Sequence, residues 1–235
     1  MALPKINNPT HTLELPSTGE SIKFRPFLVK EQKILLMAQE SNDESQISDA
    51  MGQLVTACTD GAIDPNVSPM FDLEYVFINI RSKSVGSKVK VSVACPDDEE
   101  TRVPVTIDLD DLSVQMLDNH STEINITDNV KVNFRYPILK DMKNIPNNAS
   151  DLDKVFHVMT NCIVNIEFGD EVYQRSDISE KEINNFIDEL TGEQFEKVVE
   201  FFNTMPKLRH VVKVKNPKTK VESEVVLEGL ESFLG

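Results

Sequence analysis

The chain has 235 residues and a formal net charge of -15, with 24 Lys and Arg against 39 Asp and Glu. Hydrophobic residues make up 40% and charged residues 27%, the balance of a folded globular protein. Nucleic acid and anionic membrane are disfavoured as partners, because an acidic surface is repelled by both. No apolar run reaches the roughly 20 residues of a membrane-spanning helix, and the N-terminus lacks the apolar segment of a signal peptide. We therefore expect a cytosolic protein.

The first part of the chain predicts a hairpin followed by three helices. Alternating apolar residues around a Pro-Gly turn predict a β-hairpin from Thr12 to Phe27. Apolar residues at helical spacing then predict a helix over residues 29–40 and a second, capped by Asp43, that ends near residue 58. A third helix is expected with Ser68 as its N-cap and Pro69 as its first residue.

The rest of the chain predicts two more hairpins, a strand and three helices. Hairpins are expected over residues 88–107 and 210–227, and a strand over 130–136, whereas residues 109–117 are ambiguous. A polar link covers 143–150, and capping pairs beginning at Ser150, Ser179 and Thr191 each open a helix, the first of which extends to Ile163. The pattern predicts an α+β fold of antiparallel hairpins with about six amphipathic helices packed against them. Residues 1–142 and 143–235 are the expected domains, or one continuous domain.

Two segments repeat the same order of features. Residues 88–112 and 209–230 each follow helical material and run strand, X-Pro turn, strand and Leu-rich turn. Hairpins are common, so this pattern alone leaves duplication of a helix-plus-hairpin unit open.

Catalytic and metal-binding motifs are missing from the sequence. There is no glycine-rich phosphate loop, nucleophile elbow or zinc-binding helix motif. Cys58, Cys95 and Cys162 are widely spaced, and we assign Cys58 and Cys162 to packing. His157 could be a general base, but local contacts on a helix flank explain it better. The acidic run at 97–100 lacks the ligand spacing of a calcium loop and is expected to be a solvated turn. We expect no enzyme activity, metal or cofactor.

Several segments resemble a known family. The longest is Leu15-Pro16-Ser17-Thr18-Gly19 followed by residues 22–36, and four further segments agree in order: 80–86, 130–137, 205–208 and 224–230. Together they resemble the baseplate hub subunit and hub assembly family of T-even-like contractile-tailed bacteriophages. The resemblance implies a non-enzymatic virion protein that is present in host cytoplasm during assembly and then in the tail baseplate. Other hub or tape-measure proteins are the implied partners.

Two alternatives remain at this stage. The chain could be a transient assembly chaperone that binds the tape-measure protein and leaves the particle. A hydrolase that uses His157 with a nearby carboxylate is a more distant alternative.

The sequence departs from the family pattern at two hairpin turns. Relatives often carry C-x-x-C zinc knuckles there, whereas this chain has Cys95-Pro96-Asp97-Asp98 and Asn216-Pro217-Lys218-Thr219. The departure removes zinc from the expected ligands and leaves the hairpins to be stabilised by packing.

The candidate partner-binding residues lie at the two ends of the chain. Near the N-terminus they are basic residues beside apolar ones in an otherwise acidic chain: Lys23, Arg25, Lys30 and Lys33. Near the C-terminus they are Leu230 and Phe233, in an apolar segment that also includes Leu227 and Leu234. The simpler interpretation is that the neighbouring Phe24, Phe27, Leu28 and Ile34 only pack the hairpin onto its helix. The basic residues are the better test of docking, because charge reversal at exposed positions is expected to spare folding.

Overall fold

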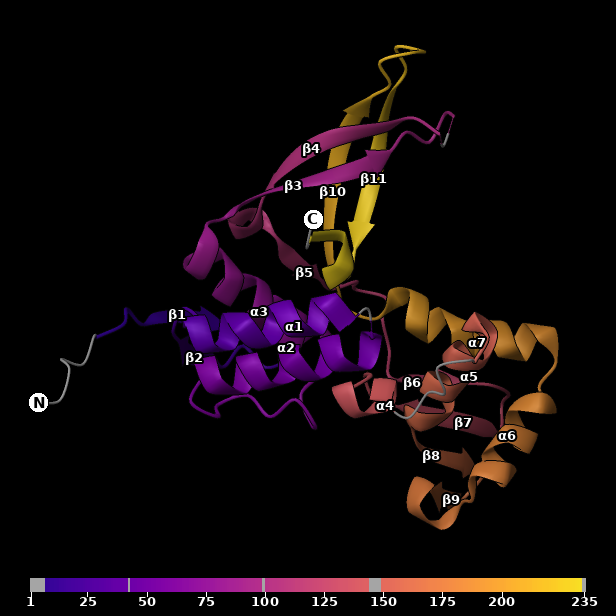
Figure 1. Ribbon diagram of the computed structural model, residues 1–235. Helices are drawn as coiled ribbons and strands as arrows, with labels where there is room; N and C mark the ends of the chain where they lie inside the picture. Colours follow the sequence, from indigo (N-terminus) through magenta and orange to yellow (C-terminus); the bar gives the residue numbers. More distant parts are fainter. Residues whose placement is uncertain (1–6, 42, 99, 144–148, 234–235) are drawn as a thin grey trace, which may run out of the picture. The chain divides into compact units, whose positions relative to one another are not determined.

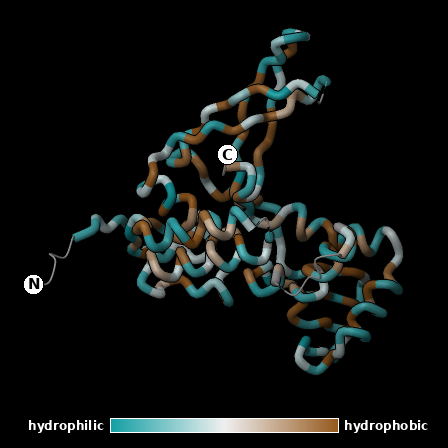
Figure 2. Tube along the Cα trace, in the orientation of Figure 1, coloured by the Kyte–Doolittle hydropathy of each residue, from teal (hydrophilic) through white to brown (hydrophobic). Residues whose placement is uncertain are grey.

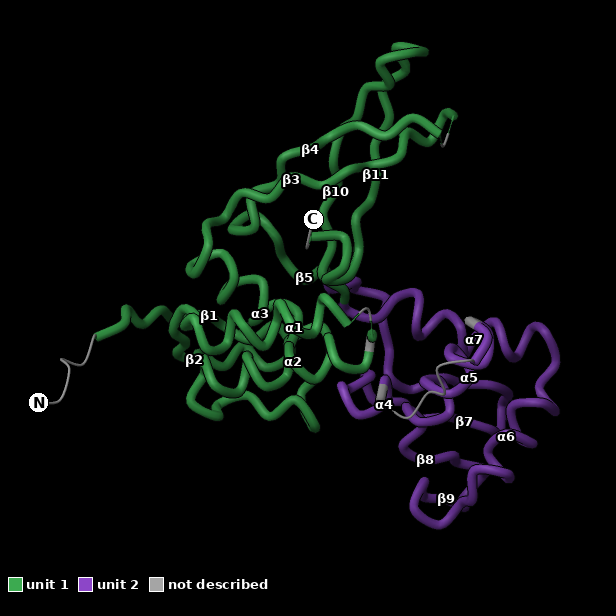
Figure 3. Tube along the Cα trace, viewed as in Figure 1, with its two compact units in different colours: residues 1–115, 207–235 green, residues 116–206 purple. Residues whose placement is uncertain are grey.

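The computed structural model describes residues 7–41, 43–98, 100–143 and 149–233. The chain forms two units: residues 1–115 together with 207–235, and residues 116–206 (Figure 3). The expected domain boundary near residue 142 falls within the second unit. Most of the predicted polar link, residues 144–148, and Leu234 lie outside the described residues.

The first unit begins with a short hairpin and three helices (Figure 1). These elements are β1 His11–Glu14, β2 Ser21–Phe24, α1 Val29–Ser41, α2 Glu44–Cys58 and α3 Met70–Val85. Helix α3 is the most buried of the three helices, with core residues on more than one face. It therefore forms the centre of this unit's core.

Two long hairpins complete the first unit. Their elements are β3 Lys88–Ala94 with β4 Arg102–Asp108, and β10 Lys207–Lys215 with β11 Glu222–Glu228. Strand β10 also pairs with β5 Ser113–Gln115. Each hairpin is followed by a 3-10 turn, η1 Leu109–Asp111 or η3 Leu230–Phe233. Polar residues gather at the hairpin tips (Figure 2).

The second unit is a four-stranded antiparallel sheet with helices packed against it. The strand order is β6-β7-β8-β9. The strands are β6 Glu123–Asn125, β7 Val130–Phe134, β8 Ile163–Phe168 and β9 Glu171–Gln174. The helices are α4 Leu139–Lys143, α5 Asp151–Asn161, α6 Glu180–Asp188 and α7 Gly192–Thr204, with the 3-10 turn η2 Arg175–Asp177. Val132, Phe134, Met159 and Phe201 lie at the centre of its core.

The described elements confirm the predicted α+β class and correct some boundaries. Capping boxes at Ser150, Ser179 and Thr191 open α5, α6 and α7 as expected. Pro69, not Ser68, is the N-cap of α3, because its extended backbone already lies outside the helix. Ile163 was expected in a helix but begins β8, and the β8–β9 hairpin was not predicted. Among the described residues, no helix is both long and apolar enough to span a bilayer.

An arginine clamp joins the first hairpin to the end of α2. The backbone amide of Arg25 donates to the carbonyl of Cys58 at 2.9 Å. Its guanidinium donates to the carbonyl of Ala57 and to the carboxylate of Glu31, both at 3.1 Å. Glu31 also accepts the amide of Leu28 at 2.7 Å. These bonds fix the end of strand β2 to the first turn of α1 and to the last turn of α2.

The second unit contains the same clamp. The amide of Arg135 donates to the carbonyl of Cys162, and its guanidinium donates to the carbonyl of Asn161, each at 2.8 Å. The guanidinium also pairs with Asp141, six residues later, the spacing of Arg25 and Glu31. Asp141 accepts the amide of Ile138 at 2.9 Å. Both units therefore contain a hairpin, a clamp arginine, its carboxylate partner and a cysteine in the same order along the chain.

The second half of each repeat also matches. Helix α3 leads into the β3–β4 hairpin and η1, and α7 leads into the β10–β11 hairpin and η3. The sequence echo between 88–112 and 209–230 thus belongs to a longer structural repeat, with the β8–β9 hairpin and α6 added in the second copy. The last hairpin of this second copy lies in the first unit.

Candidate interaction surface

Helix α1 is held in place by two buried residues. Glu31 is fixed by the arginine clamp, and Ala38, two turns later on the same face, is also buried. The remaining circumference is largely uncovered. A helix of 13 residues that is anchored along one narrow stripe leaves most of its side chains accessible.

The accessible part of α1 is apolar. Val29, Ile34, Leu36 and Met37 are exposed, and Met37 retains 70% of its accessible surface. Because they surround the buried stripe, these side chains cannot all face the unit's own core. Exposed apolar residues clustered on one element are typical of a protein-binding surface.

Three of the predicted basic residues are exposed, and two of them lie on α1. Lys30 and Lys33 are exposed on α1, and Lys23 is exposed on β2. Lys30 lies 3.4 Å from the carboxylate of Glu31, but its own side chain is largely in solvent. We define the α1 surface as Val29, Lys30, Lys33, Ile34, Leu36 and Met37.

The other three predicted residues are not available in the same way. Arg25 belongs to the clamp, and its side chain is only 19% exposed. Leu230 and Phe233 are buried in the first unit. Charge reversal at Arg25 therefore tests folding as much as docking, contrary to the expectation from sequence.

The simpler packing interpretation holds for only part of the neighbouring apolar set. Phe24 is buried, whereas Ile34 is exposed. Sequence reasoning did not select Val29, Leu36 or Met37. The available signal was the unusually broad apolar distribution of this helix, which exceeds what one buried face needs.

The two long hairpins meet at their tips without the residues of a zinc site. The side-chain amide of Asn216 donates to both carboxylate oxygens of Asp97 at 3.1 Å, and the hydroxyl of Thr219 donates to Asp97 at 2.5 Å. Cys95 is the one thiol at the four knuckle positions, so the set does not fit tetrahedral zinc. Hydrogen bonds join the tips instead.

The cysteines of the two clamps have environments suited to packing. Burial raises the pKa of Cys58 to about 11 and that of Cys162 to about 12. Both thiols therefore stay protonated at neutral pH and are poor nucleophiles.

His157 lies in a groove between α5 and α6, together with Asp153, Glu180 and Asp188. The side-chain amide of Asn161 contacts Nε2 of His157 at 3.0 Å. Among the described residues, no carboxylate is hydrogen-bonded to the His157 ring. The base and orienting carboxylate of a hydrolytic site are thus not assembled there.

Comparison with known proteins gives one match. The family model described as T4 bacteriophage base plate protein matches residues 8–235. No significant match was found among curated proteins or among solved structures.

Proposed function

Because the chain belongs to the T4 bacteriophage base plate protein family, we propose that it is a non-enzymatic protein of the baseplate hub. In this proposal the α1 surface docks on an acidic surface of another hub or tape-measure protein during tail assembly. The chain is made in the host cytoplasm and is carried into the virion baseplate.

One observation supports the docking site above all. The α1 surface combines exposed apolar side chains with Lys30 and Lys33, in a chain whose net charge is -15. A basic apolar patch on an acidic protein favours an acidic partner, since like-charged surfaces elsewhere on the chain repel it. The apolar residues supply contact area and the lysines supply orientation.

The first prediction concerns Lys30→Glu with Lys33→Glu. Stability should change by less than about 0.5 kcal/mol at the exposed Lys33, and by up to about 1 kcal/mol at Lys30, whose ion pair with Glu31 is lost. Co-purification with baseplate hub proteins from infected cells should fall at least fivefold, because the reversed charges repel an acidic partner. Quantitative mass spectrometry of affinity-purified complexes measures the loss.

The matched control is Lys88→Glu with Lys90→Glu. These lysines are exposed on β3 and give the same change in net charge within the same unit. The control should co-purify like the wild type. Wild-type recovery of hub proteins by the folded α1 variant would show that docking occurs elsewhere.

The hub subunit and the assembly chaperone differ in where the protein ends up. A hub subunit remains in the finished particle, whereas a chaperone leaves it. Proteomics of purified virions should detect this chain in a fixed ratio to other baseplate proteins. Its absence from virions but presence in assembly intermediates would favour the chaperone.

A further inference from the structure

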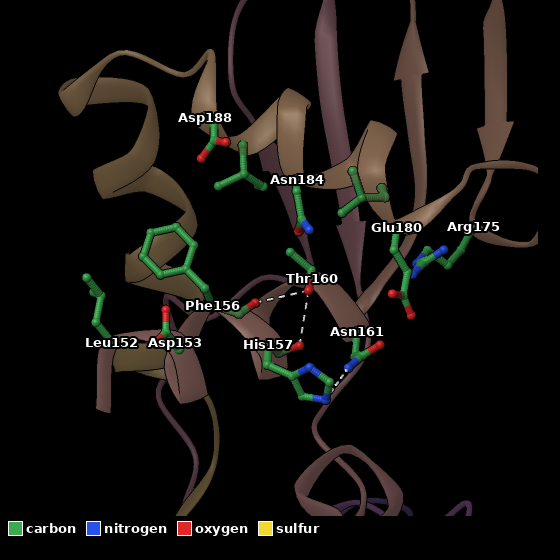
Figure 4. Close-up of a pocket in the computed structure, with 12 residues that line it drawn as sticks. Leu152, Asp153, Phe156, His157, Thr160, Asn161, Arg175, Glu180, Asn184 and Asp188 are labelled. Carbon is green, nitrogen blue, oxygen red and sulfur yellow. Dashed lines mark hydrogen bonds between the residues drawn. The ribbon is translucent and has the colours of Figure 1, made fainter. Parts of the chain in front are cut away.

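Helices α5 and α6 form a groove on the second unit that is separate from the α1 surface (Figure 4). Its volume is about 480 Å³. Ile183 and Ile187 form part of its apolar lining, together with Leu152 and Phe156. The side chain of Asn184, midway along α6, points toward the space between the two helices.

The structural repeat shows that apolar residues of α5 are more exposed than the matching position on α2. In the first repeat, α1 has 13 residues and packs against α2, whereas its counterpart α4 has five described residues. Met51 on α2 is 4% exposed. Val155, which precedes Cys162 by the same number of residues as Met51 precedes Cys58, is 55% exposed. Leu152, one turn earlier, is exposed as well.

The rim of the groove is acidic at both ends of α6. Glu180 begins the helix and Asp188 ends it. Arg175 also lines the groove near Glu180, but its guanidinium donates to the carbonyl of Ile178 at 2.9 Å. Among the described residues, neither carboxylate has a hydrogen bond or an ion pair, and eight residues of helix separate them by about 12 Å. Two unpaired carboxylates at this spacing match basic residues two turns apart on a second helix.

We propose that this groove binds an amphipathic helix from another protein, whose apolar face covers the exposed apolar residues of α5. The partner helix has an apolar stripe that packs against Leu152 and Phe156 in the groove and reaches Val155, which is exposed on α5 beside the groove lining. It carries two Lys or Arg residues about eight positions apart that pair with Glu180 and Asp188. Helices recognised in this way use apolar anchors at i, i+3, i+4 and i+7.

The steric test uses a synthetic probe and a variant that fills the groove. The probe is a 14-residue helical peptide with a leucine stripe and two lysines eight positions apart. Asn184→Trp should weaken its binding at least tenfold, measured by fluorescence anisotropy. Asn185→Trp is the matched control, because Asn185 is exposed on the same helix but does not line the groove. Equal binding by both variants, or no saturable binding to the wild type, would overturn the proposal.

The charge test remains informative if the tryptophan variant does not fold. Glu180→Lys with Asp188→Lys should weaken binding of the lysine peptide about tenfold and should gain binding of the peptide with glutamates in place of lysines. Asp170→Lys with Glu189→Lys, two exposed sites outside the groove, should leave binding of the lysine peptide within twofold. The proposal is wrong if the two reversals have the same effect.

A particle-level measurement separates the groove from the α1 surface. Phage carrying Asn184→Trp should assemble fewer infectious particles than phage carrying Asn185→Trp, while the α1 surface is unchanged. Wild-type titres for Asn184→Trp would refute the groove as a docking site and leave α1 docking untouched. Sedimentation that shows self-association of the wild type, lost in Asn184→Trp, together with no peptide binding, would identify a second copy as the occupant and overturn the partner helix.

Discussion

The two arginine clamps join segments that are far apart in the chain. Each guanidinium connects the end of a strand to the last turn of a helix through carbonyl oxygens and one carboxylate. Glu31 and Asp141 are both buried, so either carboxylate would lose its compensating charge if its arginine were removed. An unpaired buried charge costs more than the pair itself contributes.

The clamps differ in how far solvent screens them, which gives a residue-level prediction. The Arg25 side chain is 19% exposed and that of Arg135 is 37% exposed. Arg25→Ala should therefore lower the free energy of unfolding by about 3 kcal/mol. Arg135→Ala should lower it by about 1 kcal/mol, because solvent screens the more exposed ion pair. Urea denaturation measures both changes.

A double variant distinguishes the clamp from simple loss of packing. Arg25→Ala with Glu31→Gln should be more stable than Arg25→Ala alone, because no uncompensated carboxylate remains. If the double variant were the less stable of the two, Arg25 would act through packing of its alkyl chain.

At the level of elements, the β3–β4 and β10–β11 hairpins depend on each other at their tips. Asn216 is fully buried, and its side chain both donates to Asp97 and accepts the amides of Lys218 and Thr219. It therefore shapes its own turn and holds the neighbouring one. Hydrogen bonds therefore connect the two turns directly.

We predict that Asn216→Ala destabilises the first unit by about 2 kcal/mol, because Asp97 and two turn amides lose a buried partner. Hydrogen exchange should rise in both hairpins, including β3–β4, which carries no substitution. Lys218→Ala, exposed in the same turn, should leave exchange in β3–β4 unchanged. An increase confined to β10–β11 in the Asn216 variant would show that the tips are independent.

For the whole molecule, stability depends on how a strongly acidic chain distributes its carboxylates. Several are stabilised in the ionised form by hydrogen bonds, including Asp97, Asp110 and Glu182, whose pKa values are lowered. Glu74 on α3 is the opposite case. Burial raises its pKa to about 7, against the effect of a hydrogen bond from the backbone amide of Leu230.

The sign of the resulting pH dependence follows from linkage. The pKa of Glu74 is higher in the folded chain than its ordinary value of 4.5, so the folded state binds the proton more tightly. Its contribution to stability is full below pH 4.5 and is lost as pH rises through about 7. The carboxylates whose pKa values are lowered titrate below the pH range of Glu74, so they affect stability at lower pH.

We predict that Glu74→Gln removes this loss, since glutamine stays neutral. The variant should gain roughly 2 kcal/mol relative to the wild type between pH 5 and pH 8, allowing for partial exposure of the side chain. Urea unfolding at both pH values measures the difference. A constant difference between the two proteins would mean that Glu74 ionises normally in the folded chain.

The sequence by itself determined most helices, the three main hairpins and the α+β class. Capping pairs such as Ser179 with Glu182, and apolar periodicity within a helix, are local signals that neighbouring residues carry in full. Lys30 and Lys33, two residues of the α1 surface, could be predicted from the sequence for the same reason.

Only the tertiary structure decided which of these residues face solvent. Arg25 and Lys30 look equivalent in sequence, yet the guanidinium of Arg25 donates hydrogen bonds to Glu31 and to a backbone carbonyl at the end of α2. Phe233 is buried because a distant part of the chain covers it, whereas Met37 has no such cover. The groove beside Asn184 likewise needs α5 and α6 to lie side by side. Burial depends on contacts between segments remote in sequence, and local patterns do not encode those contacts.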